Sequence, residues 1–218
     1  FMIEANIKHE IFLSQLCDMV MVDSSTTTAT SLIGDGVAMG KETKKSRPPR
    51  FQYEIAAVMD SVQNMTFYEE QKHPDFNPSE YLKATGNSLF KENTAYFENR
   101  IQTTIQTSTI DAIMSRRNIK HVDFIKFDIQ GAELSALKGA LDTLKEVDVI
   151  QMEIHIAHLN DQAPSFFELH AFMAAQGFAV RDQGQVFRTE APRKLLVGMD
   201  FFWVRTSSPF WASQHHPE

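Results

Sequence analysis

Two acidic side chains stand where a predicted strand meets a predicted helix. Asp128 follows an apolar run of β-forming residues, Gly131 comes next as a turn, and Glu133 opens a helical stretch. An ionised carboxylate at a strand end can accept a ligand's hydrogen bond, worth ~1.5–3 kcal/mol. Alternatively, Asp128 caps the helix, where the helix dipole favours a carboxylate by ~0.3–1 kcal/mol, and the same dipole explains Glu133. We take Asp128 as the first candidate catalytic residue and Glu133 as a candidate contact to substrate or cofactor.

A second polar group lies at the end of another predicted strand. Glu153 and His155 are spaced two apart there, and His158 follows. Imidazole has an ordinary pKa of ~6.5, which suits proton transfer near neutrality, so His155 is a candidate general base. The alternatives are a metal site and ordinary polar residues at a strand end. The three residues straddle a strand end and a loop, which guarantees no common face, so no metal is predicted.

The spacing of apolar residues predicts the elements that position these side chains. Residues 122–127 are too apolar for a strand with one wet face, which fits the middle of a parallel sheet. Leucines at 134, 137, 141 and 144 then mark one face of a helix. Open α/β sheets bind their ligands at the carboxyl ends of the strands, where Asp128 is expected.

Further elements follow from the same patterns. A helix is predicted to begin at Ser108 as its cap, and another at Ser165, where Glu168 completes a capping-box spacing and Gly177 ends the helix. Residues 23–50 are expected to be a flexible insertion, residues 69–99 to border a substrate pocket, and residues 206–218 to be a peripheral tail. Strands are predicted at 1–5, 51–58, 65–68, 101–107, 147–156, 178–182 and 200–205, and a helix at 7–16.

Length and composition restrict the class of protein. A chain of 218 residues, of which 43% are hydrophobic, suits one α/β domain over residues 1–218. A formal net charge of −7 argues against a nucleic-acid partner. A single cysteine, Cys17, cannot form an internal disulfide, which favours the cytoplasm. No apolar run is long enough to predict a membrane span, and no signal peptide is visible.

The central stretch VDFIKFDIQGAELSALKGA resembles the signature of the FkbM family of S-adenosylmethionine (SAM)-dependent methyltransferases. The matching residues are Lys126, Asp128, Gly131, Ala132, Glu133, Leu137, Gly139 and Ala140. The resemblance implies a Rossmann-like class I methyltransferase sheet, mostly parallel with an antiparallel last strand and helices on both faces. It also implies SAM as cofactor.

The resemblance extends to the cofactor-binding positions. Glu4 ends the family's second strand, and an acid at that place takes ribose hydroxyls in nucleotide-binding α/β units. Ala57 and Val58 follow the third strand, where the family contacts adenine. The alternatives are a surface glutamate and two residues buried by packing. No Gly-rich turn stands ahead of Glu4, so we expect an N-terminally truncated sheet and weak or absent SAM binding by these 218 residues.

Two functions from different classes are consistent with the sequence. The first is SAM-dependent O-methylation of a small sugar-like or metabolite acceptor that carries a hydroxyl. The second is a non-catalytic Rossmann-like module that has lost the donor site and binds a partner. Neither the acceptor nor the oligomeric state is specified by any sequence feature.

Overall fold

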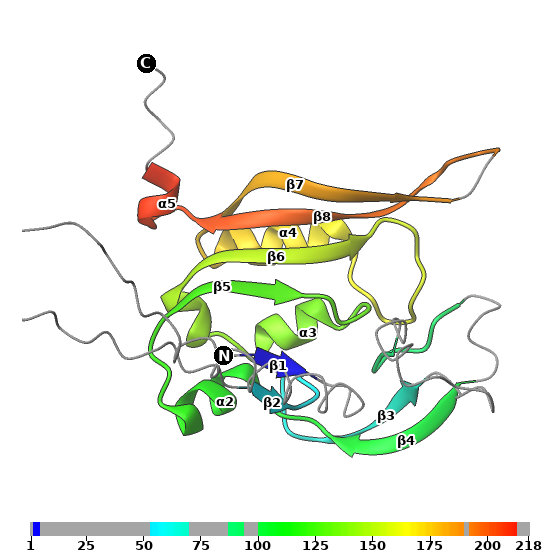
Figure 1. Ribbon diagram of the computed structural model, residues 1–218, viewed down its shortest axis with the longest axis horizontal. Coiled ribbons are helices and arrows are strands. Elements are labelled where there is room, and N and C mark those ends of the chain that lie inside the picture. The colour runs from blue at the N-terminus through cyan, green and yellow to red at the C-terminus, as the bar shows by residue number, and fades with distance from the viewer. Residues whose placement is uncertain (1, 5–52, 70–86, 94–99, 190–191, 213–218) are drawn as a thin grey trace, which may run out of the picture. The chain divides into compact units, whose positions relative to one another are not determined.

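The computed structural model describes residues 2–4, 53–69, 87–93, 100–189 and 192–212 (Figure 1). The chain divides into two compact units, Phe1–Ala56 and Ala57–Glu218. In the first unit, β1 (Met2–Glu4) and β2 (Tyr53–Ile55) form a parallel pair, with Glu4 opposite Ile55. β2 ends at Ile55, three residues before the predicted end at residue 58, whereas residues 1, 5, 51 and 52 of the two predicted strands lie outside the described residues. The expected insertion at 23–50 and helix at 7–16 lie outside the described residues.

The second unit is built on a four-stranded mixed sheet. Its strands are β5 (Val122–Phe127), β6 (Val147–His155), β7 (Phe178–Arg188) and β8 (Leu196–Arg205), in the order β5-β6-β8-β7. β5 and β6 are parallel, whereas β8 is antiparallel to both β6 and β7. The predicted antiparallel last strand is therefore confirmed, and it lies inside the sheet between β6 and β7.

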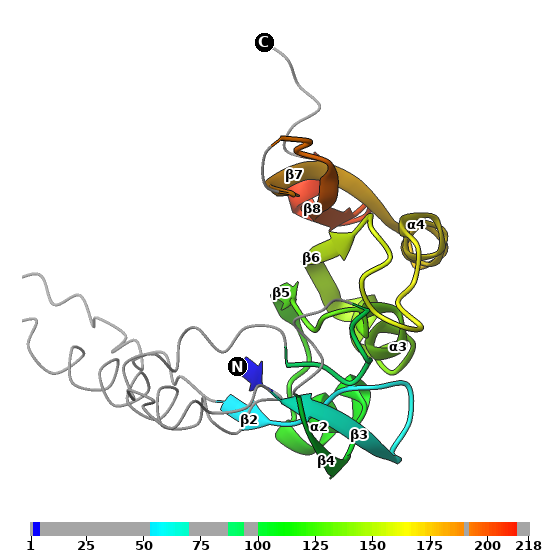
Figure 2. The same ribbon diagram turned by 90° about the vertical axis from the view of Figure 1, so that its right-hand side faces the viewer.

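Helices cover one face of this sheet. α3 (Glu133–Lys138) and α4 (Phe166–Ala175) lie on the same side of the strands in Figure 2. The residues between them and the strands form a tight apolar core, since the following side chains are at most 1% exposed: Leu137, Ile150, Met152, Leu169, Met173 and Trp203. Helices on the opposite face stay a prediction, and the helix predicted at 7–16 lies outside the described residues.

α4 begins as its sequence predicts. The Ser165 hydroxyl accepts a hydrogen bond from the Glu168 amide, and the Glu168 carboxylate accepts one from the Ser165 amide. This capping box satisfies donors that a helix N-terminus otherwise leaves unpaired. Leu169 and Met173, four residues apart, then face the sheet.

A two-stranded antiparallel ribbon precedes the sheet along the chain. It consists of β3 (Asn64–Glu69) and β4 (Ile101–Gln106), and it leads into α2 (Ile110–Arg117). The cap of α2 is Thr109, whose hydroxyl accepts from the Ala112 amide, so the predicted cap at Ser108 was wrong by one residue. The Ser108 backbone instead pairs with Ala57 and Met59, which holds it in an extended bridge.

The helix predicted from Leu134 to Leu144 is interrupted. α3 ends at Lys138, and a separate 3₁₀ turn, η4 (Thr143–Glu146), follows. Gly139 lies against another backbone, because a Cβ placed on it would be 2.1 Å from the Met59 carbonyl oxygen. The helix ends where this close approach occurs, at Gly139. Leu141, beyond the end of the helix, is 44% exposed instead of facing the core.

β5 is also less buried than its apolar sequence predicts. Phe124 is 48% exposed, whereas Phe127 at the end of the strand is buried. Among the described residues β5 pairs with β6 alone, so it stands at one edge of the four-stranded sheet. Within the described unit, β5 therefore does not occupy the central, fully covered position that its sequence predicts.

The first residues of the predicted tail pack against the sheet unit. Ser208 is buried, a short helix α5 (Pro209–Ala212) follows, and the Arg181 guanidinium lies 5.2 Å from the ring centre of Trp211. No described helix is long and apolar enough to cross a membrane.

Candidate active site

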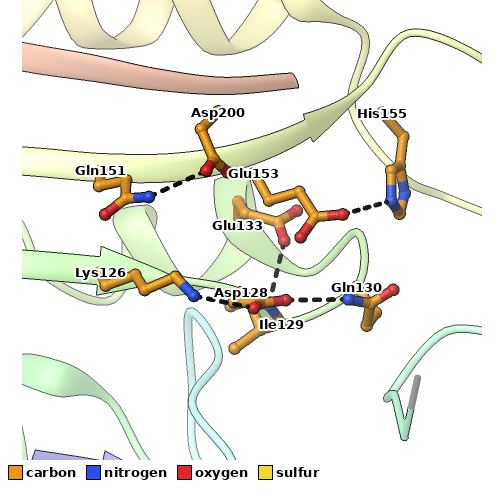
Figure 3. Close-up of polar contacts among 9 residues, drawn as sticks. All are labelled: Lys126, Asp128, Ile129, Gln130, Glu133, Gln151, Glu153, His155 and Asp200. Atoms are coloured by element: carbon orange, nitrogen blue, oxygen red, sulfur yellow. Dashed lines mark hydrogen bonds and ion pairs between the residues drawn. The ribbon is translucent and has the colours of Figure 1, made fainter. Parts of the chain in front are cut away.

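Asp128 lies directly after β5, with its side chain exposed. The Lys126 ammonium is 3.1 Å from one carboxylate oxygen, and the Gln130 amide donates to the other at 2.9 Å (Figure 3). Asp128 does not cap α3, because the cap residue is Ala132, which has no side-chain hydrogen bond. Lys126 and Asp128 form an ion pair with both side chains exposed. Asp128 therefore presents a solvent-accessible carboxylate at the carboxyl end of a strand.

Glu133 has a different environment. It is the first residue of α3, is 4% exposed, and accepts hydrogen bonds from the Ile129 and Gly131 amides at 3.3 and 3.2 Å. Burial raises the pKa of Glu133, although the amide hydrogen bonds and the charge of His155 act in the opposite direction. Its carboxylate holds the loop between β5 and α3 in shape.

The β5–α3 loop packs tightly against the loop that follows β6. Gly131 has a φ of +98°, and a Cβ there would lie 2.9 Å from Ala163 Cβ and 3.2 Å from Asn160 Cβ. Glycine is required both by the left-handed backbone and by this close approach. Asn160 is 2% exposed, and its amide reaches the Phe90 carbonyl at 3.5 Å. Three separate chain segments thus meet around Asn160.

Glu153 and His155 form a pair at the end of β6. His155 Nε2 lies 3.2 Å from Glu153 Oε1, and both side chains are mostly buried. The hydrogen bond to Glu153 raises the pKa of His155; burial opposes this, while the charges of Glu153 and Glu133 and a hydrogen bond with Asn160 reinforce it. An imidazole that is oriented by a carboxylate can accept a proton from a ligand once it is neutral.

Asp200 and Asn160 also belong to the site and were not predicted from the sequence. The antiparallel register of β6 and β8 places Asp200 opposite Glu153, and the Gln151 amide donates to Asp200 at 3.1 Å. Figure 3 shows Asp200 near Glu153, with Gln151 on the side away from His155. Finding Asp200 from the sequence would have required knowing that β8 lies next to β6, whereas nothing in the sequence marks Asn160.

Three further residues predicted to contact the cofactor are Glu4, Ala57 and Val58. Ala57 and Val58 are buried, and the backbone of this segment pairs with Ser108. Packing explains their burial, so an adenine contact remains a prediction. Glu4 ends β1 in the other compact unit, and its distance to Asp128 is not defined.

Comparison with known families decides the class. The model of the methyltransferase FkbM domain matches residues 36–180, which is more than half of the chain. The chain belongs to the FkbM methyltransferase family. The matched range contains Ala57, Val58, Asp128, Glu133 and His155 but not Glu4.

Membership of the FkbM family makes methyl transfer the function class and implies a methyl donor. No curated protein and no solved structure was found to match the chain. The role of each side chain in this FkbM domain therefore rests on its own geometry.

Proposed function

We propose that this FkbM protein is a SAM-dependent O-methyltransferase of the Rossmann-like class I type. Its acceptor is proposed to be a small, sugar-like or metabolite molecule that carries a hydroxyl. The observation that carries the proposal is a row of ionisable side chains at the carboxyl ends of β5 and β6 in a chain of this family: Asp128, Glu153 and His155. That edge is where open α/β sheets bind ligands.

Asp128 is the proposed contact for the donor. SAM supplies, when bound, a methyl group activated by the positive charge on sulfur. The donor set fits its ammonium and hydroxyl groups, because Asp128 offers an exposed carboxylate whose present partners, Lys126 and Gln130, are themselves exposed or half-exposed and can be displaced. Glu4 is proposed for the ribose hydroxyls, and Ala57 and Val58 for the adenine.

His155 is the proposed general base. A hydroxyl that becomes methylated must lose its proton, and neutral imidazole accepts it at a ring nitrogen. Glu153 stabilises the imidazolium that forms, since it lies 3.2 Å away. Such a base contributes roughly 10²- to 10⁴-fold to a rate. Methyl transfer depends otherwise on alignment of the reactants and exclusion of water.

A non-catalytic role is the second candidate, and one observation favours it. Both carboxylate oxygens of Asp128 are already engaged, by Lys126 and Gln130, so the side chain has a structural partner set without any ligand. A non-catalytic Rossmann-like module that binds a partner requires no ligand contact from Asp128 beyond these two hydrogen bonds.

A methyl-transfer assay separates the two. The protein translated from the complete gene is incubated with SAM carrying a labelled methyl group and with a panel of hydroxyl-bearing acceptors. We expect transfer by the unmodified protein, at least 100-fold slower transfer by His155→Ala, and unchanged transfer by His158→Ala, an exposed histidine three residues away. Absence of transfer above the protein-free background would favour the binding module, and equal rates for the two variants would remove His155 from the mechanism.

A further inference from the structure

A second cluster of ionisable side chains lies at the opposite end of the same two strands. His121 directly precedes β5, Asp123 is the second residue of β5, and Asp148 is the second residue of β6. Val122 pairs with Val147 and Phe124 with Val149, so the register places Asp123 beside Asp148. Side chains alternate along a strand, and both therefore point to the same face of the sheet.

The distances within this cluster match a metal coordination sphere. His121 Nε2 lies 3.6 Å from Asp123 Oδ1 and 3.1 Å from Asp148 Oδ2, and all three atoms lie within 4.8 Å of one another. Ligand atoms ~2.0–2.2 Å from a tetrahedral zinc ion are about 3.3–3.6 Å apart, a range that lies within the two measured distances. Small side-chain rotations would bring the second carboxylate into place.

The charges favour a cation at this position. Two carboxylates directly opposite each other on neighbouring strands repel. Asp148 is 14% exposed, so its charge is poorly solvated, whereas Asp123 is 87% exposed. Arg205 lies opposite Asp148 on β8, and its Nε donates to the Val147 carbonyl. Burial lowers the pKa of Arg205, and the charges of Asp148 and Glu146 act in the opposite direction. One guanidinium leaves the pair of aspartates incompletely neutralised.

We propose that His121, Asp123 and Asp148 bind one divalent transition-metal cation of the Zn²⁺ type. One imidazole and two carboxylates are ligands that zinc accepts, and the exposure of Asp123 leaves room for a water as the fourth ligand. Mg²⁺ is a poor occupant, because it prefers oxygen ligands in a regular octahedron. The bound ion would join the amino ends of β5 and β6, away from Asp128 and His155.

Titration of the chelator-treated 218-residue protein with ZnCl₂ tests this site directly. We expect His121→Ala and Asp148→Asn to lose one equivalent of Zn²⁺, or at least tenfold in its affinity. His158→Ala provides the matched control and should bind as the unmodified protein does. Zn²⁺ should also raise the melting temperature of the unmodified protein more than that of His121→Ala, since a ligand that binds the folded state stabilises it. MgCl₂ at the same concentration should do neither.

Asp123→Asn keeps the test decisive if Asp148→Asn does not fold. The Asp123 side chain is 87% exposed, so its replacement leaves the core intact. Wild-type Zn²⁺ stoichiometry and affinity in both His121→Ala and Asp123→Asn would overturn the proposal. So would the absence of Zn²⁺ binding by the unmodified protein.

Discussion

Two acids five residues apart, Asp128 after β5 and Glu133 at the start of α3, have opposite environments. Asp128 is exposed and holds only side-chain partners, whereas Glu133 is buried and holds backbone amides. Ligand contact suits the first, because its partners can be displaced at low cost. Glu133, a candidate for ligand contact from its sequence, is better suited to positioning the loop that carries Asp128.

Replacement of Glu133 should therefore lower the stability of the folded protein rather than act directly on methyl transfer. Glu133→Ala leaves the Ile129 and Gly131 amides without an acceptor, at a cost on the order of 1–3 kcal/mol per buried group. We expect a lower melting temperature for Glu133→Ala and a smaller loss for Glu133→Gln, which keeps an acceptor oxygen. Thermal unfolding measures both, and equal melting temperatures for the two variants would contradict the positioning role.

The same residue gives a pH dependence of stability. Burial raises the pKa of Glu133 in the folded state, so its contribution is fully present below the unfolded-state pKa and decreases as pH rises through the folded-state value. Glu133→Gln does not ionise. The stability difference between the unmodified protein and Glu133→Gln should hence change with pH over this range, and a constant difference from acid to neutral pH would count against a buried, titrating carboxyl.

His155 predicts a pH profile for methyl transfer. Glu153 holds the pKa of His155 above its ordinary value, so the neutral, proton-accepting form appears only on the alkaline side of that value. We expect the rate to rise with pH through the raised pKa. Glu153→Gln removes the largest cause of the shift and should move this rise to lower pH. A rise at the same pH in both proteins would show that another group accepts the proton.

Elements were predictable from the sequence where local rules decide them. Ser165 and Glu168 determine the start of α4, and Gly177 follows its end, so this helix was predicted closely. The helix expected from Leu134 to Leu144 failed for a non-local reason: Gly139 touches the backbone of Met59, eighty residues earlier in the chain. Leucine periodicity contains no information about that contact.

The contact at Gly139 predicts a large effect from a small substitution. A Cβ would lie 2.1 Å from the Met59 carbonyl oxygen, closer than real atoms approach, so α3 or residues 59–60 must move. We expect Gly139→Ala to destabilise the protein by roughly 1–3 kcal/mol. Lys138→Ala, at the exposed neighbouring position, is the control. Chemical denaturation that gives equal unfolding free energies for both variants would contradict the close packing.

At the scale of the whole molecule, the family and the ends of β5 and β6 could be predicted from the sequence. The residues that strand pairing brings next to those ends could not. Asp128 and His155 were placed at the ends of β5 and β6 because apolar runs stop there. Asp200 was missed, since its position opposite Glu153 depends on the insertion of β8 beside β6. The His121, Asp123 and Asp148 cluster was missed for the same reason, as it exists only through the register of β5 and β6.

The most direct test of the account is the binding of S-adenosylhomocysteine to the protein translated from the complete gene. Calorimetric titration of the unmodified protein should give saturable binding. Asp128→Asn should weaken it roughly 10- to 100-fold, the loss expected for one charge-assisted hydrogen bond. Asp142→Asn, an exposed aspartate that likewise pairs with a lysine, should leave it unchanged. Equal affinity in Asp128→Asn and the unmodified protein, or no binding by the unmodified protein, would contradict a donor site at the end of β5.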